Sequence, residues 1–373
     1  MDRPALGVRS DLADLAPYIS PQLPAKVRLN TNESPYPPPR EMLEEVEQGL
    51  RAEALNRYPE RDARDLTDGL AARTGWSRDG IWIANGSNEV FLHLFLAFGG
   101  PERTCLTFEP TYSLHSNIAR IAGTMTASAP RARTWDIPDG TLEGALDEHR
   151  PDIVLFCSPN NPTGLLESRA AVEIALQRVP IVVVDEAYIE FARDGSSLSE
   201  LLDDHPNLVI VNTFSKAWSL AGVRLGYLLA DPTIVEELYR VRLPYHLSTF
   251  TQLVGNAALR HEDDGAQRIA AIVGERERIM QGLSDRGFEP YPSEANFVLF
   301  EVGDRSPSGA DRTDAIWKGL LDRGVLVRNY PSSPMHKSPA SSMLAGMLRV
   351  TAGLPEETDE FLETLDDVLE EMS

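Results

Sequence analysis

Uninterrupted apolar runs alternate with amphipathic stretches from about residue 80 to residue 230 of this 373-residue chain. The runs are rich in Val, Ile and Leu and lack the alternation of polar and apolar positions that marks a strand with one wet face. Such strands are covered on both faces, as in parallel sheets, whereas a stretch such as 167–179 predicts a helix. The sequence therefore predicts an α/β fold with a largely parallel sheet. The predicted strands are 104–108, 152–157, 181–187, 208–214 and 224–230.

The pattern changes after about residue 250, where a long helical periodicity is interrupted near Asp263 to Gly265. Strands at "ANFVLFEV", "VLVRNY" and "MLRVTAG", a helix at "RTDAIWKGLLDRG" and an acidic helix from Pro355 follow, which predicts a smaller α+β domain. We therefore expect three parts: an N-terminal arm packing on the small domain or on a dimer partner (1–40), a large domain (41–265) and a small C-terminal domain (266–373).

The charge balance and the cysteines narrow the class of protein. A net charge of −22 argues against binding nucleic acid through a basic surface. Cys105 and Cys157 lie in apolar runs, which favours buried free thiols and a reducing cytoplasm over a disulfide. The N-terminus lacks an apolar signal segment and no window reaches the ~18 apolar residues of a membrane span, so no membrane partner is expected. The seven histidines show no metal-binding spacing, so no metal is expected.

Lys216 is one of only four lysines in a chain with 35 basic residues. An amine, unlike a guanidinium, can lose its proton and form a Schiff base with a carbonyl. Ligands of open α/β sheets gather beyond the carboxyl ends of the strands, and four polar motifs lie at such positions. These motifs are "NGSNE" (85–89), "SPNNPTG" (158–164), "DEAY" (185–188) and "TFSK" (213–216).

Together the motifs supply what pyridoxal phosphate requires. They offer the amine of Lys216, the carboxylate of Asp185, the amide of Asn161, the phenol of Tyr188 and a helix N-terminus near Ser87 for a phosphate. Each motif alone has a structural interpretation: "GSNE" is an ordinary helix cap and "SPNNPTG" is typical of turns.

In order and spacing the motifs resemble those of the fold-type I, pyridoxal-phosphate-dependent aminotransferases, and within them the class II family of histidinol-phosphate aminotransferases. The resemblance runs from "LAPYISPQLPAKVRLNTNESPYPPP" through "NRYPERDA", "EPTYS" and "TFSKAWSLAGVRLGY" to "LRVTAGLPEETDEFLETL". It implies a large cofactor-binding domain whose mostly parallel central sheet is flanked by helices, plus a smaller α+β domain.

The resemblance also implies roles in catalysis and cofactor binding. Lys216 would hold the cofactor as a Schiff base and then move a proton between substrate and cofactor. Asp185 would pair with the pyridinium nitrogen, and its burial would strengthen that contact. Tyr188 and Asn161 would bind the phenolic oxygen of the ring, and Tyr112 would stack on the ring face.

The implied contacts of the cofactor phosphate come from both subunits of a homodimer. Within one subunit they are Ser87, Asn88, Thr213, Ser215 and Arg224. Tyr58 in "NRYPE" would reach the phosphate from the neighbouring subunit, so the two active sites are shared. The family usually has Asp in place of Asn88, a mild change if the backbone does the binding.

The implied substrate-binding residues are Tyr18, Asn32, Arg328 and Arg349. On so acidic a chain the two arginines could instead form surface ion pairs. A planar guanidinium fork suits both a phosphate and a carboxylate, so the same residues could hold two anionic substrates in turn. His246, where many relatives have Asn, is expected only to line the pocket.

The implied reaction converts L-histidinol phosphate and 2-oxoglutarate to imidazole acetol phosphate and L-glutamate, in histidine biosynthesis, by a ping-pong route through pyridoxamine phosphate. An aromatic amino acid aminotransferase and, less so, a threonine-phosphate decarboxylase remain alternatives. The segment 331–348 is longer than the family usually allows and lies where the substrate tail is expected. The sequence therefore leaves the amine substrate open.

Overall fold

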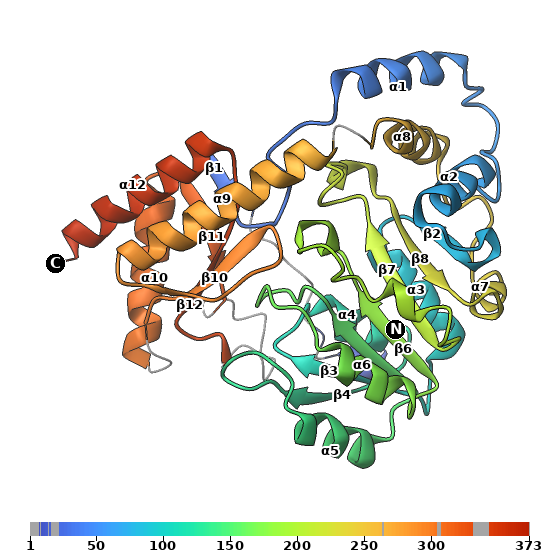
Figure 1. The fold of residues 1–373 in the computed structure, drawn as a ribbon, viewed down its shortest axis with the longest axis horizontal. Coiled ribbons are helices and arrows are strands. Elements are labelled where there is room, and N and C mark those ends of the chain that lie inside the picture. Colours follow the sequence, from blue (N-terminus) through green and yellow to red (C-terminus); the bar gives the residue numbers. More distant parts are fainter. Residues whose placement is uncertain are drawn as a thin grey trace, which may run out of the picture.

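The computed structural model describes residues 7, 9–13, 15, 22–262, 265–303, 307–330 and 343–372. These residues form two β-sheets, each covered by helices, which lie side by side in Figure 1. The strands of the larger sheet are β2 (Ile81–Ala84), β3 (Thr104–Glu109), β4 (Met125–Pro130), β5 (Ile153–Cys157), β6 (Ile181–Asp185), β7 (Leu208–Thr213) and β8 (Gly226–Ala230).

The larger sheet has the strand order β2-β8-β7-β6-β5-β3-β4. Strands β4, β3, β5, β6 and β7 run parallel, and β8 is antiparallel to both of its neighbours, β7 and β2. The α/β class and the largely parallel sheet predicted from the sequence are confirmed. The prediction missed β4, because its sequence "MTASAP" at the sheet edge has small and polar residues in place of an apolar run, and β2, which is only four residues long.

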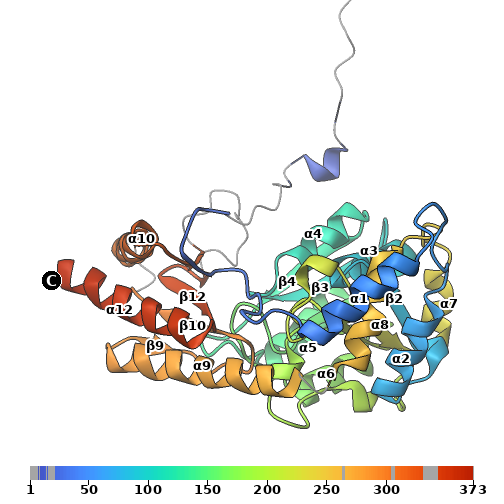
Figure 2. The same ribbon diagram turned by 90° about the horizontal axis from the view of Figure 1, so that it is seen from above.

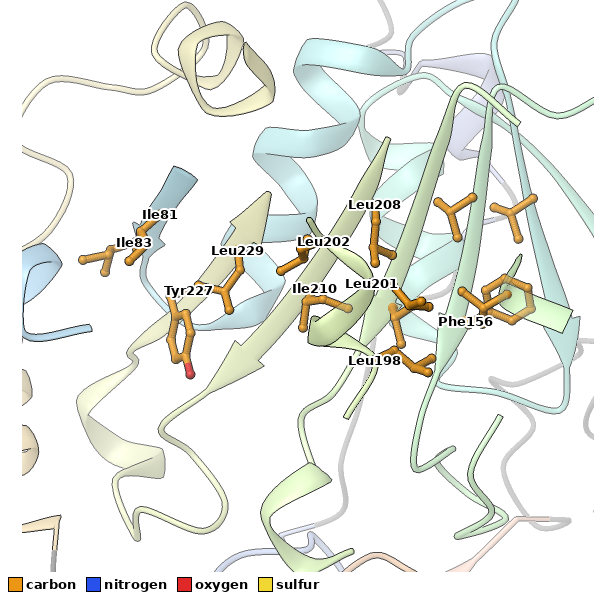
Figure 3. Close-up of a cluster of buried hydrophobic side chains, with 14 of the residues drawn as sticks. Ile81, Ile83, Phe156, Leu198, Leu201, Leu202, Leu208, Ile210, Tyr227 and Leu229 are labelled. Atoms are coloured by element: carbon orange, nitrogen blue, oxygen red, sulfur yellow. The ribbon is translucent and has the colours of Figure 1, made fainter. Parts of the chain in front are cut away.

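Helices cover both faces of the larger sheet, which explains its continuous apolar strands. In β6, Val182 and Val184 belong to one buried cluster, and Ile181 and Val183 belong to another on the opposite face. Figure 3 shows part of the first cluster, which extends across the sheet to Phe156. The helices packed on this first face are α1 (Arg40–Ala52), α2 (Arg64–Thr74), α5 (Asp139–His149), α6 (Arg169–Leu176) and α8 (Thr249–Arg260). Those on the second face are α3 (Ser87–Phe98), α4 (Leu114–Ile121) and α7 (Pro232–Leu238).

The smaller sheet joins an N-terminal strand to C-terminal ones. Its strands are β1 (Val27–Leu29), β9 (Glu289–Pro290), β10 (Phe297–Glu301), β11 (Val325–Asn329) and β12 (Met347–Thr351), in the order β1-β11-β12-β10-β9. Strand β1 runs parallel to β11, and the other pairs are antiparallel. The domain boundaries after residues 40 and 265 stay a prediction.

Three long helices accompany the smaller sheet: α9 (Gly265–Asp285), α10 (Pro307–Asp322) and α12 (Pro355–Glu371). Figure 2 shows α9 and α12 packed against each other along one side of it. The helical pattern after residue 250 is thus divided between α8 and α9, at the place where the sequence predicted a break. Short 3-10 helices occupy Ser10–Leu12, Arg78–Gly80, Ile189–Phe191, Ser199–Leu201 and Ala221–Val223.

Both cysteines are buried free thiols, as the sequence predicted. Burial raises the pKa of Cys105 to about 12 and that of Cys157 well above its ordinary value, so both stay protonated at neutral pH. Among the described residues, no helix combines the length and the apolar character needed to cross a bilayer.

We predict that Phe156→Ala lowers the free energy of unfolding by about 3–5 kcal/mol, because it empties a fully buried aromatic site. The Phe156 side chain is 1% exposed and its ring stacks on Phe108 at a centroid distance of 5.4 Å. Guanidinium unfolding followed by circular dichroism measures the loss. Leu96→Ala is the control, since Leu96 is 46% exposed and should change stability by less than about 1 kcal/mol. Equal losses in the two variants would contradict the prediction.

Candidate active site

A cavity of about 420 Å³ lies where the two sheets meet, at the edge where the parallel strands end. Because β2 runs parallel to β7, the loops after β2, β3, β5, β6 and β7 all reach this edge. From the smaller sheet come the segment after β1 and residues of β11 and β12. The residues predicted from the sequence that line the cavity are Asn32, Ser87, Asn88, Tyr112, Asn161, Asp185, Tyr188, Thr213, Ser215, Lys216, Arg224, Arg328 and Arg349.

Tyr18 and Tyr58, which the sequence predicts as binding residues, are not part of this lining. Tyr18 lies outside the described residues. Tyr58 is 80% exposed and its ring stacks on Tyr245 at 4.5 Å with an interplanar angle of 13°. A contact of Tyr58 with the cavity of its own subunit is therefore absent, and its role in a neighbouring subunit stays a prediction.

Lys216 follows β7 and lies partly buried in the cavity, where its Nζ donates to the main-chain oxygen of Thr31 at 3.1 Å. Burial, and after it the positive charge of Arg349, lower the pKa of the amine to about 8. With that pKa, about one amine in ten is neutral at pH 7, a fraction that an ordinary lysine reaches only above about pH 9. The site therefore holds an amine that can act as a nucleophile or a base near neutral pH.

Asp185 ends β6 and is 3% exposed. Its Oδ2 lies 2.8 Å from Nε2 of His115, and its Oδ1 accepts from the Ala187 amide at 3.1 Å. Since a carboxylate only accepts hydrogen bonds, Nε2 carries the ring proton in this pair. His115 thus orients the carboxylate.

Sequence analysis did not identify His115. It lies three residues after Tyr112, and the Tyr112 ring meets the imidazole edge-on at 5.2 Å. The spacing from Tyr112 is the one available signal, because three residues place two side chains on the same side of a helical turn. Nothing in the sequence links His115 to Asp185, 70 residues away.

Tyr188 receives two hydrogen bonds on its phenolic oxygen. They come from Nδ2 of Asn32 at 3.0 Å and from Nδ2 of Asn161 at 3.3 Å. Burial raises the pKa of Tyr188 well above its ordinary value, so the phenol keeps its proton. That proton is available to a hydrogen-bond acceptor in the cavity.

Arg349 is 6% exposed and joins this network from β12. Its guanidinium donates to Oδ1 of Asn161 and, at 3.0 Å, to the main-chain oxygen of Asn30. Both acceptors are neutral, and neither Arg349 nor the neighbouring Arg328 forms an ion pair within the part of the chain that the structure describes. The two arginines therefore carry uncompensated positive charge into the cavity.

A second positive region lies at the start of α3. Gly86 adopts a φ of +82° and precedes the helix without a side-chain cap, so the first N–H groups of α3 open toward the cavity. The hydroxyls of Thr213 and Ser215 lie 3.0 Å apart, and Nη1 of Arg224 approaches Ser215 Oγ at 3.4 Å. N–H groups, hydroxyls and a guanidinium around one point are the donors that a phosphate prefers.

Gly226 is required for this arrangement. A Cβ atom at this position would lie 2.4 Å from the Ser87 amide nitrogen and 2.6 Å from the Gly86 carbonyl carbon. Both are main-chain atoms that cannot rotate away. The glycine of "RLGY" thus lets β8 pass directly behind the loop that begins α3.

Asn85 fixes the same loop. Its main-chain N and its Nδ2 donate to Glu89 Oε2 at 2.6 and 2.8 Å, and Nδ2 also donates to the His246 carbonyl at 3.0 Å. His246 is not among the residues that line the cavity, so the expectation that it lines the pocket is wrong. Its ring turns instead toward the main-chain oxygen of Ile83, at 3.0 Å from Nε2.

The donor set fits pyridoxal phosphate. The cavity brings together an amine of lowered pKa, a buried carboxylate with an orienting partner, a protonated phenol and an aromatic ring, and it places a phosphate cradle at one end. Of the segment 331–348, which was expected near the substrate tail, residues 331–342 lie outside the described residues.

The family "Aminotransferase class I and II" matches residues 24–365. Histidinol-phosphate aminotransferase of Frankia casuarinae is 44% identical over 378 residues, which cover 98% of this chain and 90% of the relative. The corresponding protein of Thermobifida fusca is 44% identical over 367 residues, 96% of this chain and 95% of the relative.

Solved structures resemble this chain in fold. Histidinol-phosphate aminotransferase from Sinorhizobium meliloti, in complex with pyridoxal-5'-phosphate, superposes with a TM-score of 0.83 at 25% identity and covers 94% of this chain and 92% of that one. L-threonine-O-3-phosphate decarboxylase from Porphyromonas gingivalis has a TM-score of 0.76 at 22% identity and covers 92% of this chain and 99% of that one, a likeness of fold alone.

We predict that the Lys216 amine of the cofactor-free protein reacts with fluorodinitrobenzene at a rate that rises with a midpoint at about pH 8. Only the neutral amine attacks the reagent, so the rate follows its deprotonation. Peptide mapping resolves the site easily, because the chain has few lysines. A lysine model peptide, which titrates near about 10.4, is the control. A Lys216 profile that coincides with the peptide would contradict the lowered pKa.

Proposed function

Because the chain belongs to the aminotransferase class I and II family, we propose that it is a pyridoxal-phosphate-dependent aminotransferase that converts L-histidinol phosphate and 2-oxoglutarate to imidazole acetol phosphate and L-glutamate, in histidine biosynthesis. The observation that carries the proposal is the placement of the Lys216 amine between two positive regions of one cavity. One region would hold the phosphate of the cofactor, and the other would hold the anionic group of the substrate.

Bound pyridoxal phosphate supplies an electron sink that stabilises the negative charge left when an amine substrate loses its α-proton. The residues of this chain bind, orient and move protons around it. Lys216 accepts the proton and returns it at the neighbouring carbon, and its lowered pKa suits both steps near neutral pH. Asp185, which His115 orients, would pair with the ring nitrogen of the cofactor and favour its protonated form.

Tyr188 and Asn161 would donate hydrogen bonds to the phenolic oxygen of the cofactor, and Tyr112 would cover one face of the ring. The cradle formed by the start of α3, Thr213, Ser215 and Arg224 would hold the phosphate. The presence of these side chains around one cavity supports the roles. They agree with the roles that the sequence motifs imply.

Arg328 and Arg349 would bind the substrate anion. Histidinol phosphate presents a phosphate and glutamate presents carboxylates, and a guanidinium fork can pair with either. The hydrogen bonds of Arg349 to the neutral oxygens of Asn161 and Asn30 orient the fork without cancelling its charge. The histidinol-phosphate relatives support this substrate over an aromatic amino acid or threonine phosphate.

We further propose a cytoplasmic homodimer. Large apolar side chains are exposed near Tyr58, on the segments 55–58 and 243–250, which supports a subunit contact there. They are Leu55, Tyr58, Leu243, Tyr245 and Phe250. Two unpaired buried thiols suit a reducing compartment.

The absorbance of the holoenzyme, recorded before and after addition of histidinol phosphate without an oxo-acid, tests the function. We expect the visible cofactor band to disappear and to return on addition of 2-oxoglutarate, because the amino group is transferred in two separate half-reactions. Lys216→Ala should bind the cofactor noncovalently and lose turnover by several orders of magnitude. A band that responds to phenylalanine and not to histidinol phosphate would overturn the substrate assignment. Near-normal turnover of Lys216→Ala would overturn the mechanism.

Mixed dimers test the position of Tyr58. We expect Tyr58→Phe to weaken cofactor binding by about tenfold, the effect of one hydrogen bond to a charged group. In a purified dimer of one Lys216→Ala subunit and one Tyr58→Phe subunit, the site with an intact lysine would receive an intact tyrosine from the other subunit. Its cofactor affinity, measured by the lysine-dependent absorbance band, should be normal. Weak binding at that site would show that Tyr58 does not act across the interface.

A further inference from the structure

Arg131 is a buried cation that does not itself line the cavity. It follows β4 directly and is 5% exposed. Its Nη2 forms an ion pair with Glu167 Oε1, and the two side chains are 2% and 3% exposed. A pair of charges so far from water is costly to separate, so the two residues hold a fixed distance.

The Nε and Nη1 donors of Arg131 bind main-chain oxygens, two of them just before Tyr112. Nε donates to the oxygens of Phe108 at 3.0 Å and Pro110 at 3.1 Å. Nη1 donates to the Trp135 oxygen at 3.1 Å, which ties the guanidinium to the segment after β4 as well. Arg131 therefore fixes the path of the β3–α4 loop at the two carbonyls that precede the Tyr112 ring.

Asn160 links the same loop to the one that follows β5. Its Nδ2 donates to the Pro110 oxygen at 3.1 Å, and its Oδ1 accepts from Thr111 Oγ1 at 2.7 Å. Asn160 is fully buried and directly precedes Asn161, whose amide contacts Tyr188.

Glu167 closes the β5–α6 loop. The main-chain N of Glu167 donates to Ser158 Oγ at 3.1 Å. The main-chain N of Asn160 donates to the main-chain oxygen of Leu165 at 2.7 Å. The segment 158–167 is thus a closed loop with Asn161 on its cavity side and Glu167 on its buried side. The ion pair with Arg131 joins this loop to the one that carries Tyr112.

We propose that Arg131, through its ion pair with Glu167, is a positioning residue that sets the distance between the Tyr112 ring and the Asn161 amide. That distance decides whether a cofactor ring stacked on Tyr112 presents its phenolic oxygen to the Asn161 amide, so this inference rests on the proposed function. The role needs arginine, because a guanidinium binds several acceptors in one plane whereas a lysine offers a single point charge. Arg131 touches neither cofactor nor substrate and acts through the two loops.

Arg131→Lys, which keeps the charge and removes the fork, is the test. Arg276→Lys is the matched control: Arg276 is 6% exposed and its Nη1 donates to the oxygens of Phe191 and Ala295, which belong to neither loop. We expect comparable losses of melting temperature in the two variants. Only Arg131→Lys should raise the dissociation constant for pyridoxal phosphate, by about tenfold or more, as expected for a displaced set of contacts, and weaken the visible circular dichroism of the bound cofactor.

Hydrogen exchange of the cofactor-free protein gives a second measurement. The amides of Thr111 and Tyr112 should exchange faster in Arg131→Lys and remain unchanged in Arg276→Lys. Equal effects of the two variants on cofactor binding and exchange, or no effect of Arg131→Lys, would overturn the proposal. Neither measurement uses an amine substrate, so a failure of histidinol phosphate to react would leave this test intact.

Glu167→Gln provides the complementary variant if Arg131→Lys does not fold. It removes the charge of the partner and keeps an acceptor of similar size, so the same changes in cofactor dissociation constant and amide exchange are expected. If neither variant folds while Arg276→Lys does, the pair is required for folding and the positioning role is overturned.

Discussion

The chemistry of this chain depends on one lysine amine that is held away from water. Burial alone would make a charged Lys216 unfavourable, and the guanidinium of Arg349 adds to that cost. The fold tolerates the residue because the amine can be neutral and because the Thr31 carbonyl accepts its hydrogen bond. Both conditions require the two sheets to meet at this point. Lys216 follows a strand of the larger sheet, whereas Thr31 and Arg349 come from the smaller one. The active site is thus a property of the junction and of neither sheet alone.

The same junction determines where polar groups are placed. Both faces of the larger sheet are filled by apolar side chains, so the strand ends are the one part of it where amides, hydroxyls and carboxylates gather. Two pairs of buried polar groups lie near these strand ends, Asp185 with His115 and Arg131 with Glu167. Asp185 with His115 joins the end of β6 to α4, and Arg131 with Glu167 joins the end of β4 to the β5–α6 loop, so pairing a buried charge also fixes the segments that carry it.

The sequence predicted those parts of the fold and site that depend on local pattern. Continuous apolar runs identified the central strands, and polar motifs at their ends identified the residues of the cavity. What it missed depends on contacts between distant segments. His115 and Arg131 lie in ordinary sequence, and their partners are 70 and 36 residues away. Strand β4 has no apolar run, because it lies at the edge of its sheet, and the pairing of β1 with β11 leaves no periodic signal in a segment of three residues.

That pairing of β1 with β11 has a consequence for synthesis on the ribosome. Val27 pairs with Val325, so β1 must wait for the synthesis of about 300 further residues before its partner exists. At translation speeds of ~5–20 residues per second, the delay for some 300 residues is about 15–60 s. During that time the larger sheet can form, but the Thr31 carbonyl, two residues beyond β1, has no fixed place beside Lys216. The contact between Thr31 and Lys216 can therefore form only after β11 has been synthesised, because β1 and β11 are joined in one sheet.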